Sequence, residues 1–269
     1  MSASKACPWE GAFEPLKIFG NLYFVGSVPA SVHIVDTGDG LVMLDCGYMH
    51  ELYLTVDNMY RVGLDPHDLK YILLTHGHID HFGAARALKE LTGAKLVIGE
   101  KDAPVARGDN DLSYAKELNM EFCETFEPDI LLRDGDTVSC DNTVFTAAAT
   151  PGHTAGAMSY FFNVTDGTET FRAGLHGGMG TNTLTREYLT RYGLPFSLRD
   201  DYIASMKRLA GEKVDIFLGN HMQHNRTQEK AQRVASGDAH AFVVPGEWEA
   251  YCAWCLTYLQ ELLEREAKQ

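Results

Sequence analysis

Four potential metal ligands occur within six residues of this sequence, directly after a short apolar run. Residues 71–74 predict a buried strand, and the ligands follow it in the segment THGHIDHFG, residues 75–83. A continuous strand would send alternate side chains to opposite faces, so the ligands can converge only on an irregular backbone, for which Gly77 and Gly83 supply the freedom. Zinc accepts both imidazole nitrogen and carboxylate oxygen. The segment therefore predicts a metal site, with the candidate ligands His76, His78, Asp80 and His81.

Two further histidines follow predicted strands in the same way. His153 lies in a glycine-rich turn, TPGHTAG, after the predicted strand at residues 144–148, and His221 follows the predicted strand at 215–218. Histidines at several strand exits gather along one edge of a sheet, so we expect both to join the first four ligands. His224 comes three residues after His221 and is an alternative ligand, although the position at the strand exit favours His221.

Short apolar runs alternate with longer amphipathic stretches along the whole chain. This order suits two sheets packed face to face with helices outside, an αββα sandwich of the α/β (α+β) class, and we treat residues 1–269 as a single domain. The helix at the end of the chain carries Cys252 and Cys255 on its apolar face, which indicates core packing for both. Predicted strands are residues 22–25, 32–35, 41–44, 71–74, 96–98, 144–148, 160–164 and 215–218, and predicted helices are 51–62, 82–92, 101–107, 199–210 and 246–266.

Charge and composition exclude several classes of function. The formal net charge is −14 and no basic run occurs, which opposes binding to nucleic acid, because phosphate recognition needs clustered Lys and Arg. No stretch approaches the roughly 20 apolar residues that a membrane-spanning helix needs, so we expect no membrane segment. Residues 1–8 contain no apolar core of a signal peptide, and the six cysteines follow no disulfide framework. We therefore expect a cytoplasmic protein, or a periplasmic or secreted one if the chain has been trimmed.

These motifs together resemble the metallo-β-lactamase superfamily over most of the chain. Residues 18–26, IFGNLYFVG, look like the first hairpin of that family, and residues 39–47, DGLVMLDCG, are similar to its strand that ends in Asp-x-Gly. Within the superfamily the sequence looks most like the third β-lactamase subclass. The resemblance implies the αββα fold and two zinc ions per chain, although iron or manganese tolerates similar ligands.

The resemblance also implies a role for each ligand. The second zinc has an Asp-His-His site in this subclass, and Asp80 there also acts in catalysis by orienting the nucleophile. Asp45 would hydrogen-bond to a metal ligand and hold its orientation, as zinc sites generally require. The alternative is that Asp45 is an ordinary turn residue. The implied ligands are His76, His78 and His153 for the first zinc, and Asp80, His81 and His221 for the second.

One departure separates this chain from part of the superfamily. Many of its hydrolases, the glyoxalase II type among them, bridge the two metals with an extra aspartate, whereas the corresponding residues 171–178, FRAGLHGG, contain no carboxylate. The β-lactamase subclass lacks this bridge too, which favours that branch. His176 either lines the substrate pocket or lies on a loop. We expect the pocket walls to come from the loop after Gly26, from residues 103–127 and from 174–184, including Asn182.

The implied activity is that of a zinc-dependent hydrolase. A metal-bound hydroxide would open a cyclic amide or ester in a small and anionic substrate, and a β-lactam is the leading candidate. The alternative is a cytosolic lactonase, thioesterase or other small-molecule metallohydrolase on the same fold. A metal-binding protein without catalysis is a third reading. The sequence leaves the oligomeric state open.

Overall fold

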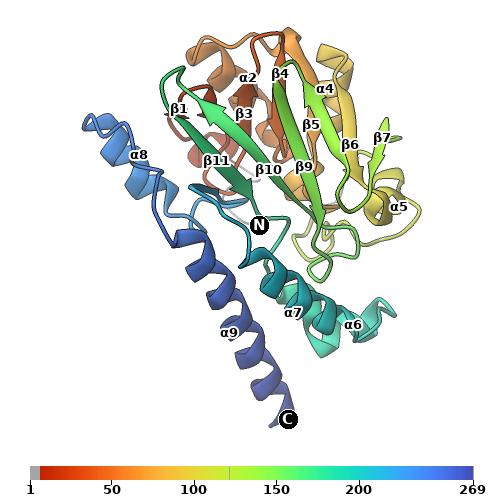
Figure 1. Cartoon of the computed structure of the whole chain (residues 1–269). Coiled ribbons are helices and arrows are strands. Elements are labelled where there is room, and N and C mark those ends of the chain that lie inside the picture. Colours follow the sequence, from red (N-terminus) through yellow and green to blue (C-terminus); the bar gives the residue numbers. More distant parts are fainter. Residues whose placement is uncertain (1–6, 121, 269) are drawn as a thin grey trace.

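Two β-sheets form the centre of the molecule. The computed structural model describes residues 7–120 and 122–268, and within them a seven-stranded sheet faces a five-stranded one (Figure 1). The first sheet runs in the order β1 (Leu16–Phe19), β2 (Leu22–Phe24), β3 (His33–Asp36), β4 (Leu41–Leu44), β5 (Leu69–Leu73), β6 (Lys95–Gly99) and β7 (Ile130–Leu132). The second runs in the order β12 (Ile216–Leu218), β11 (Thr170–Leu175), β10 (Met158–Thr165), β9 (Thr143–Ala149) and β8 (Thr137–Cys140).

Strand direction changes within each sheet. In the first sheet β1 to β4 pair antiparallel, and β4 to β7 pair parallel. In the second sheet the pairs are antiparallel except for β11 and β12. Since the parallel strands β5 and β12 are each followed by a ligand segment, their carboxyl ends are where a site can form.

Helices cover the outer faces of both sheets (Figure 1). The first sheet is covered by α2 and α4, and the second by α7 and α9. The helices are α2 (Leu52–Arg61), α3 (Ile79–Phe82), α4 (Ala85–Thr92), α5 (Ala103–Arg107), α6 (Arg186–Arg191), α7 (Leu198–Leu209), α8 (Thr227–Ala235) and α9 (Glu247–Ala267). Short 3₁₀ turns are Pro8–Gly11, Met49–Glu51, Pro66–Asp68, Glu100–Asp102 and Asn182–Leu184.

Three apolar clusters separate these four layers. The central one lies between the sheets and includes Leu44, Phe145 and Tyr160. The second joins the first sheet to α2 and α4, and the third joins the second sheet to α7 and α9. All four residues of β4 and all three of β12 are buried, as expected for strands covered on both faces. The αββα prediction is confirmed.

The predicted elements differ from the observed ones mainly where elements are short or polar. All eight predicted strands and all five predicted helices overlap observed ones. The prediction lacks β7, with three residues, and β8 and β11, in which polar side chains interrupt the apolar pattern. It also lacks β1 as a strand of its own, which only the resemblance of residues 18–26 to a hairpin indicated. It also lacks the short helix α6 and the largely polar helix α8. Cys252 and Cys255 are buried in the third cluster, which confirms their packing role. Among the described residues, no helix has the length and apolarity to cross a membrane.

Candidate metal centre

The six predicted ligands meet at one edge of the two sheets. The segment after β5 carries His76 and His78 on an irregular loop and then turns into the short helix α3, which holds Asp80 and His81. The turn after β9 brings in His153, and the loop after β12 brings in His221. Three strand exits therefore bring distant parts of the sequence together, and beside the ligands Asn220 donates a hydrogen bond to the Thr75 hydroxyl across 145 positions.

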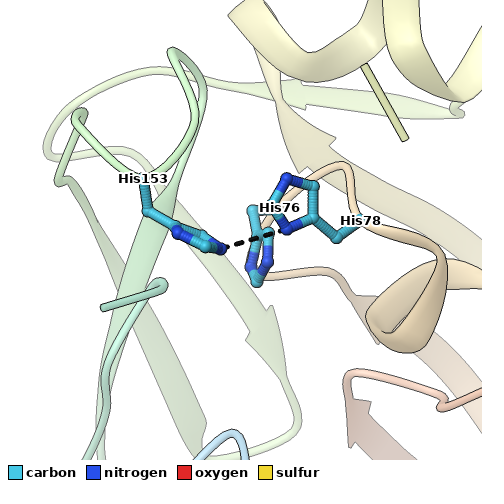
Figure 2. Close-up of side chains that lie close together, drawn as sticks. All are labelled: His76, His78 and His153. Atoms are coloured by element: carbon cyan, nitrogen blue, oxygen red, sulfur yellow. Dashed lines mark hydrogen bonds between the residues drawn. The ribbon is translucent and has the colours of Figure 1, made fainter. Parts of the chain in front are cut away.

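The first cluster consists of three buried histidines. His76, His78 and His153 each present a ring nitrogen within 4.8 Å of the other two. Their ring centroids lie 4.5–4.7 Å apart and the rings meet edge to face (Figure 2). His153 Nε2 lies 3.0 Å from His78 Nδ1, which identifies Nδ1 as the His78 atom that faces the cluster.

The second cluster combines one carboxylate with two imidazoles. Asp80, His81 and His221 also hold their ligand atoms within 4.8 Å of one another. Asp80 Oδ2 lies 3.3 Å from His81 Nε2 and 3.5 Å from His221 Nε2. His224 lies outside this group of three, although its ring packs on that of His221, so His221 stays the predicted ligand.

Hydrogen bonds on the far side of the His153 and His221 rings fix which nitrogen faces the cluster. His153 Nδ1 lies 2.7 Å from the carbonyl oxygen of Gly180, and His221 Nδ1 lies 2.8 Å from that of Pro29. Because a carbonyl oxygen only accepts, both Nδ1 atoms donate, and each Nε2 keeps a free lone pair for a metal. The loop after Gly26 thus holds a ligand through Pro29, although it does not line the cavity described below.

Asp45 orients the second cluster and, through Thr75, the first. Its Oδ2 accepts a 2.8 Å hydrogen bond from His81 Nδ1, and its Oδ1 accepts the Thr75 N–H at 2.7 Å. The Thr75 hydroxyl donates to Asp45 Oδ2, so its oxygen accepts from His76 Nδ1 at 3.0 Å. His76 Nε2 is then an unprotonated, buried nitrogen with no hydrogen-bond partner. Asp45 therefore lies behind the predicted ligands and hydrogen-bonds to one of them, and its role in holding a metal ligand stays a prediction.

The electrostatics keep the first cluster neutral and the second ion-paired. Burial lowers the pKa of His76 and His78 well below the usual range of histidine, and the neighbouring imidazoles lower it further. Burial also opposes charge on His81, but the carboxylates of Asp80 and Asp45 outweigh it and raise the pKa of His81 to about 10. Burial alone would raise the pKa of Asp80, yet His81 and His221 hold it far below its usual range.

Asp102 joins the two loops of the first cluster, and sequence reasoning missed it. Its Oδ2 accepts hydrogen bonds from the Gly77 N–H at 2.8 Å and the Thr154 hydroxyl at 2.6 Å, and its Oδ1 accepts the Gly156 N–H at 2.7 Å. Asp102 precedes α5 and so looks like a helix-capping residue, but its side chain makes no capping hydrogen bond. The burial of this carboxyl, which is 2% exposed, raises its pKa despite these three donors.

A cavity of about 120 Å³ opens onto both clusters. Asn182 lines it, as predicted, and so do Tyr114 and Leu118 from the predicted 103–127 region. The Tyr114 ring packs on His78 with centroids 5.1 Å apart, on a backbone with φ of 61°. Sequence reasoning missed Tyr114 as a wall residue, since nothing local marks it. The other wall residues beyond the ligands include Met179, Asn220 and His224.

His176 does not line this cavity. Its ring is fully buried, accepts a 3.1 Å hydrogen bond from the Gly178 N–H and packs beside Trp248 and Tyr251. Of the two readings that the sequence left open, pocket wall or loop residue, the structure therefore favours the second. The ring supports the loop of Gly178, which does line the cavity.

Known proteins share both the motifs and the architecture. The sequence model of the Metallo-beta-lactamase superfamily matches residues 25–166. The crystal structure of BJP-1, a subclass B3 metallo-beta-lactamase of Bradyrhizobium japonicum, is 29% identical and covers 98% of each chain with a TM-score of 0.87. The native FEZ-1 metallo-beta-lactamase from Legionella gormanii is 26% identical over 96% of this chain and 98% of its own, also at 0.87.

Curated relatives match over shorter regions. A hydroxyacylglutathione hydrolase from Pseudomonas aeruginosa is 34% identical over 93 residues, which make up 35% of this chain and 28% of that relative. The chain spans 59% or less of the length of other curated relatives with a similar match. The predicted likeness to the third β-lactamase subclass is confirmed by BJP-1. Because the family match covers more than half of the 269 residues, and because whole-chain matches share its two facing sheets, the chain belongs to the metallo-β-lactamase superfamily.

Proposed function

We propose that this protein is a zinc-dependent hydrolase of small molecules. One observation carries the proposal: two groups of three ligand-type side chains lie side by side and open onto one cavity. The far nitrogens of His153 and His221 are engaged by carbonyl oxygens, so the near nitrogens carry the lone pairs that a metal needs.

The residues present fit two zinc ions. Imidazole nitrogens and one carboxylate are a donor set that zinc accepts. His76 Nε2 is buried without a hydrogen-bond partner, an arrangement that costs free energy unless a ligand fills it. The neutral form of His76 and His78 is also the form that binds metal. The ligands would be His76, His78 and His153 for one zinc, and Asp80, His81 and His221 for the other.

Zinc in such a site supplies Lewis acidity and lowers the pKa of water toward about 7. Side chains of the protein would orient the attacking water and bind the substrate. The low pKa of Asp80 keeps its carboxylate ionised, so that it accepts hydrogen bonds and orients an attacking water at the cavity. The amide of Asn182 can donate to a carbonyl or carboxylate oxygen of the substrate, and the Tyr114 ring narrows the entrance beside His78.

The leading substrate is a cyclic amide, with β-lactams first. BJP-1 and FEZ-1 are described as metallo-beta-lactamases, and both match nearly the whole chain at more than 25% identity. Two zinc ions outweigh the charge of Asp80, so the site would favour an anionic substrate. The second candidate is a lactonase or thioesterase. The match to a hydroxyacylglutathione hydrolase supports this candidate.

Metal analysis followed by a substrate panel tests this proposal. Protein purified without added zinc should hold about two zinc ions per chain. It should lose activity on chelation and in His78→Ala, whereas His67→Ala, which changes an exposed histidine remote from the ligands, should keep it. Turnover of nitrocefin against lactones and thioesters then separates the two substrate classes. Full activity of the metal-free protein would overturn the proposal.

A further inference from the structure

A row of neighbouring aromatic rings, here called the file, leads from the second ligand cluster to the surface. The His221 and His224 rings have centroids 5.0 Å apart, and the His224 ring lies 5.6 Å from that of Tyr251. Tyr251 is followed by Trp254 at 6.1 Å and by Tyr258 a further 5.1 Å away. The file thus begins at a proposed metal ligand and ends on the outer side of α9.

Helix α9 sets the spacing of the last three rings. Residues three and four positions apart lie on one side of a helix, so Tyr251, Trp254 and Tyr258 form one row. The planes of Trp254 and Tyr258 are within 8° of parallel. Tyr251 is 7% exposed, but Trp254 is 50% and Tyr258 37% exposed. Tyr251 also belongs to the apolar cluster that packs α9 on the second sheet, whereas Trp254 and Tyr258 lie outside that cluster, so these two outer rings are not needed to hold the helix in place.

A groove of about 530 Å³ runs beside this row. Its apolar wall consists of Val244, Pro245, Ala250, Tyr251 and Trp254. His224 lines both this groove and the cavity over the ligand clusters. The two spaces therefore meet at one imidazole ring, which a molecule held at the clusters would have to pass to reach the groove.

The charges at the rim indicate a neutral occupant. Arg226 lies 3.4 Å from Glu247 and 3.9 Å from Glu229, so its positive charge is already compensated. Glu247 is paired in turn with the buried Lys230. Because these charges are paired with one another within the chain, the groove offers an apolar surface and no unpaired positive charge that would attract an anion.

We propose that the groove is a substrate subsite for an apolar acyl chain, carried by the substrate on the Asp80–His81–His221 side of the site. The inference rests on the proposed function, because it places the scissile group at the clusters. It narrows the substrate class to amides or esters that carry a saturated acyl substituent. Each methylene that leaves water strengthens binding about fourfold, so chain length should determine affinity.

Alkyl hydroxamates test the groove without requiring turnover. The hydroxamate group chelates zinc, so acetohydroxamate reports the metal site and octanohydroxamate reports the site plus the groove. Titration calorimetry of the zinc-loaded protein should give an octanohydroxamate Kd at least about tenfold below that of acetohydroxamate. Trp254→Ala should shrink this ratio at least about threefold. Tyr53→Ala removes an equally exposed aromatic ring from α2 and should leave the ratio unchanged.

Each other outcome has a defined meaning. If acetohydroxamate binds but octanohydroxamate binds no tighter, the groove is not an acyl subsite and the inference is wrong. An unchanged ratio in Trp254→Ala, together with a changed sedimentation coefficient, would assign this face to self-association and would also overturn it. If acetohydroxamate does not bind at all, the proposed metal site itself fails.

Discussion

Replacing Asp102 by asparagine measures how strongly a buried carboxylate outside the two clusters controls zinc binding. Asp102 accepts three hydrogen bonds from the loops of His76–His78 and His153, at 2.6–2.8 Å. Asparagine offers one oxygen where aspartate offers two, so the N–H of either Gly77 or Gly156 must face an amide N–H. The two loops then lose their common anchor while the side-chain volume stays the same.

The structure sets the expected size of the effect. A buried donor without an acceptor costs about 1–3 kcal/mol, and the remaining bonds lose their charge assistance. Burying the neutral amide is easier than burying the carboxylate, which offsets part of this loss. We expect the free energy of unfolding to fall by about 2–3 kcal/mol. The Kd of zinc at the first cluster should rise about 10–100-fold, as for other residues that orient ligands.

Urea unfolding of the metal-free protein and competition with a chromophoric zinc chelator measure the two quantities. The matched control is Asp129→Asn, because Asp129 also accepts a backbone N–H, that of Leu96 at 2.8 Å, but on a part of β6 away from the histidine loops. Asp129→Asn should lower stability and leave the zinc Kd unchanged. If Asp102→Asn behaves in the same way, Asp102 is only a structural residue and the reasoning is refuted.

Three further changes have equally defined outcomes. Burial raises the pKa of Glu51 to about 7, so the folded chain keeps a proton that the unfolded chain releases near pH 4.5, and stability falls as the pH rises through this window. In urea unfolding across that range, the free energy of unfolding of Glu51→Gln should change less with pH than that of the unchanged protein. Gly99→Ala should cost about 1–3 kcal/mol in the same assay, because a Cβ there would lie 2.1 Å from the Gly156 carbonyl oxygen. Asp45→Asn keeps a residue type that tolerates the φ of 54° but loses the carboxylate on His81, so dialysed protein should retain about one zinc ion instead of two by metal analysis.

Local sequence was sufficient to name six side chains that form two groups in the structure, and to indicate the layer order. The segment at residues 75–83 and the single histidines after β9 and β12 are signals that depend only on neighbours a few positions away. The side chains after strand exits are marked by local pattern, so six candidate ligands could be named from the sequence, whereas the packing of the two sheets brings the exits of β5, β9 and β12 together. The alternation of apolar and amphipathic runs likewise indicated two covered sheets.

Tertiary packing decided what supports and surrounds the ligands. Asp102 reaches Gly77 across 25 positions and Gly156 across 54, and nothing near it distinguishes it from a helix cap. The groove beside Trp254 depends on how α9 and the loop after β12 pack on the second sheet. Such contacts join segments that are far apart in the sequence, and their side chains meet only after both sheets have formed. No local sequence pattern therefore predicts them.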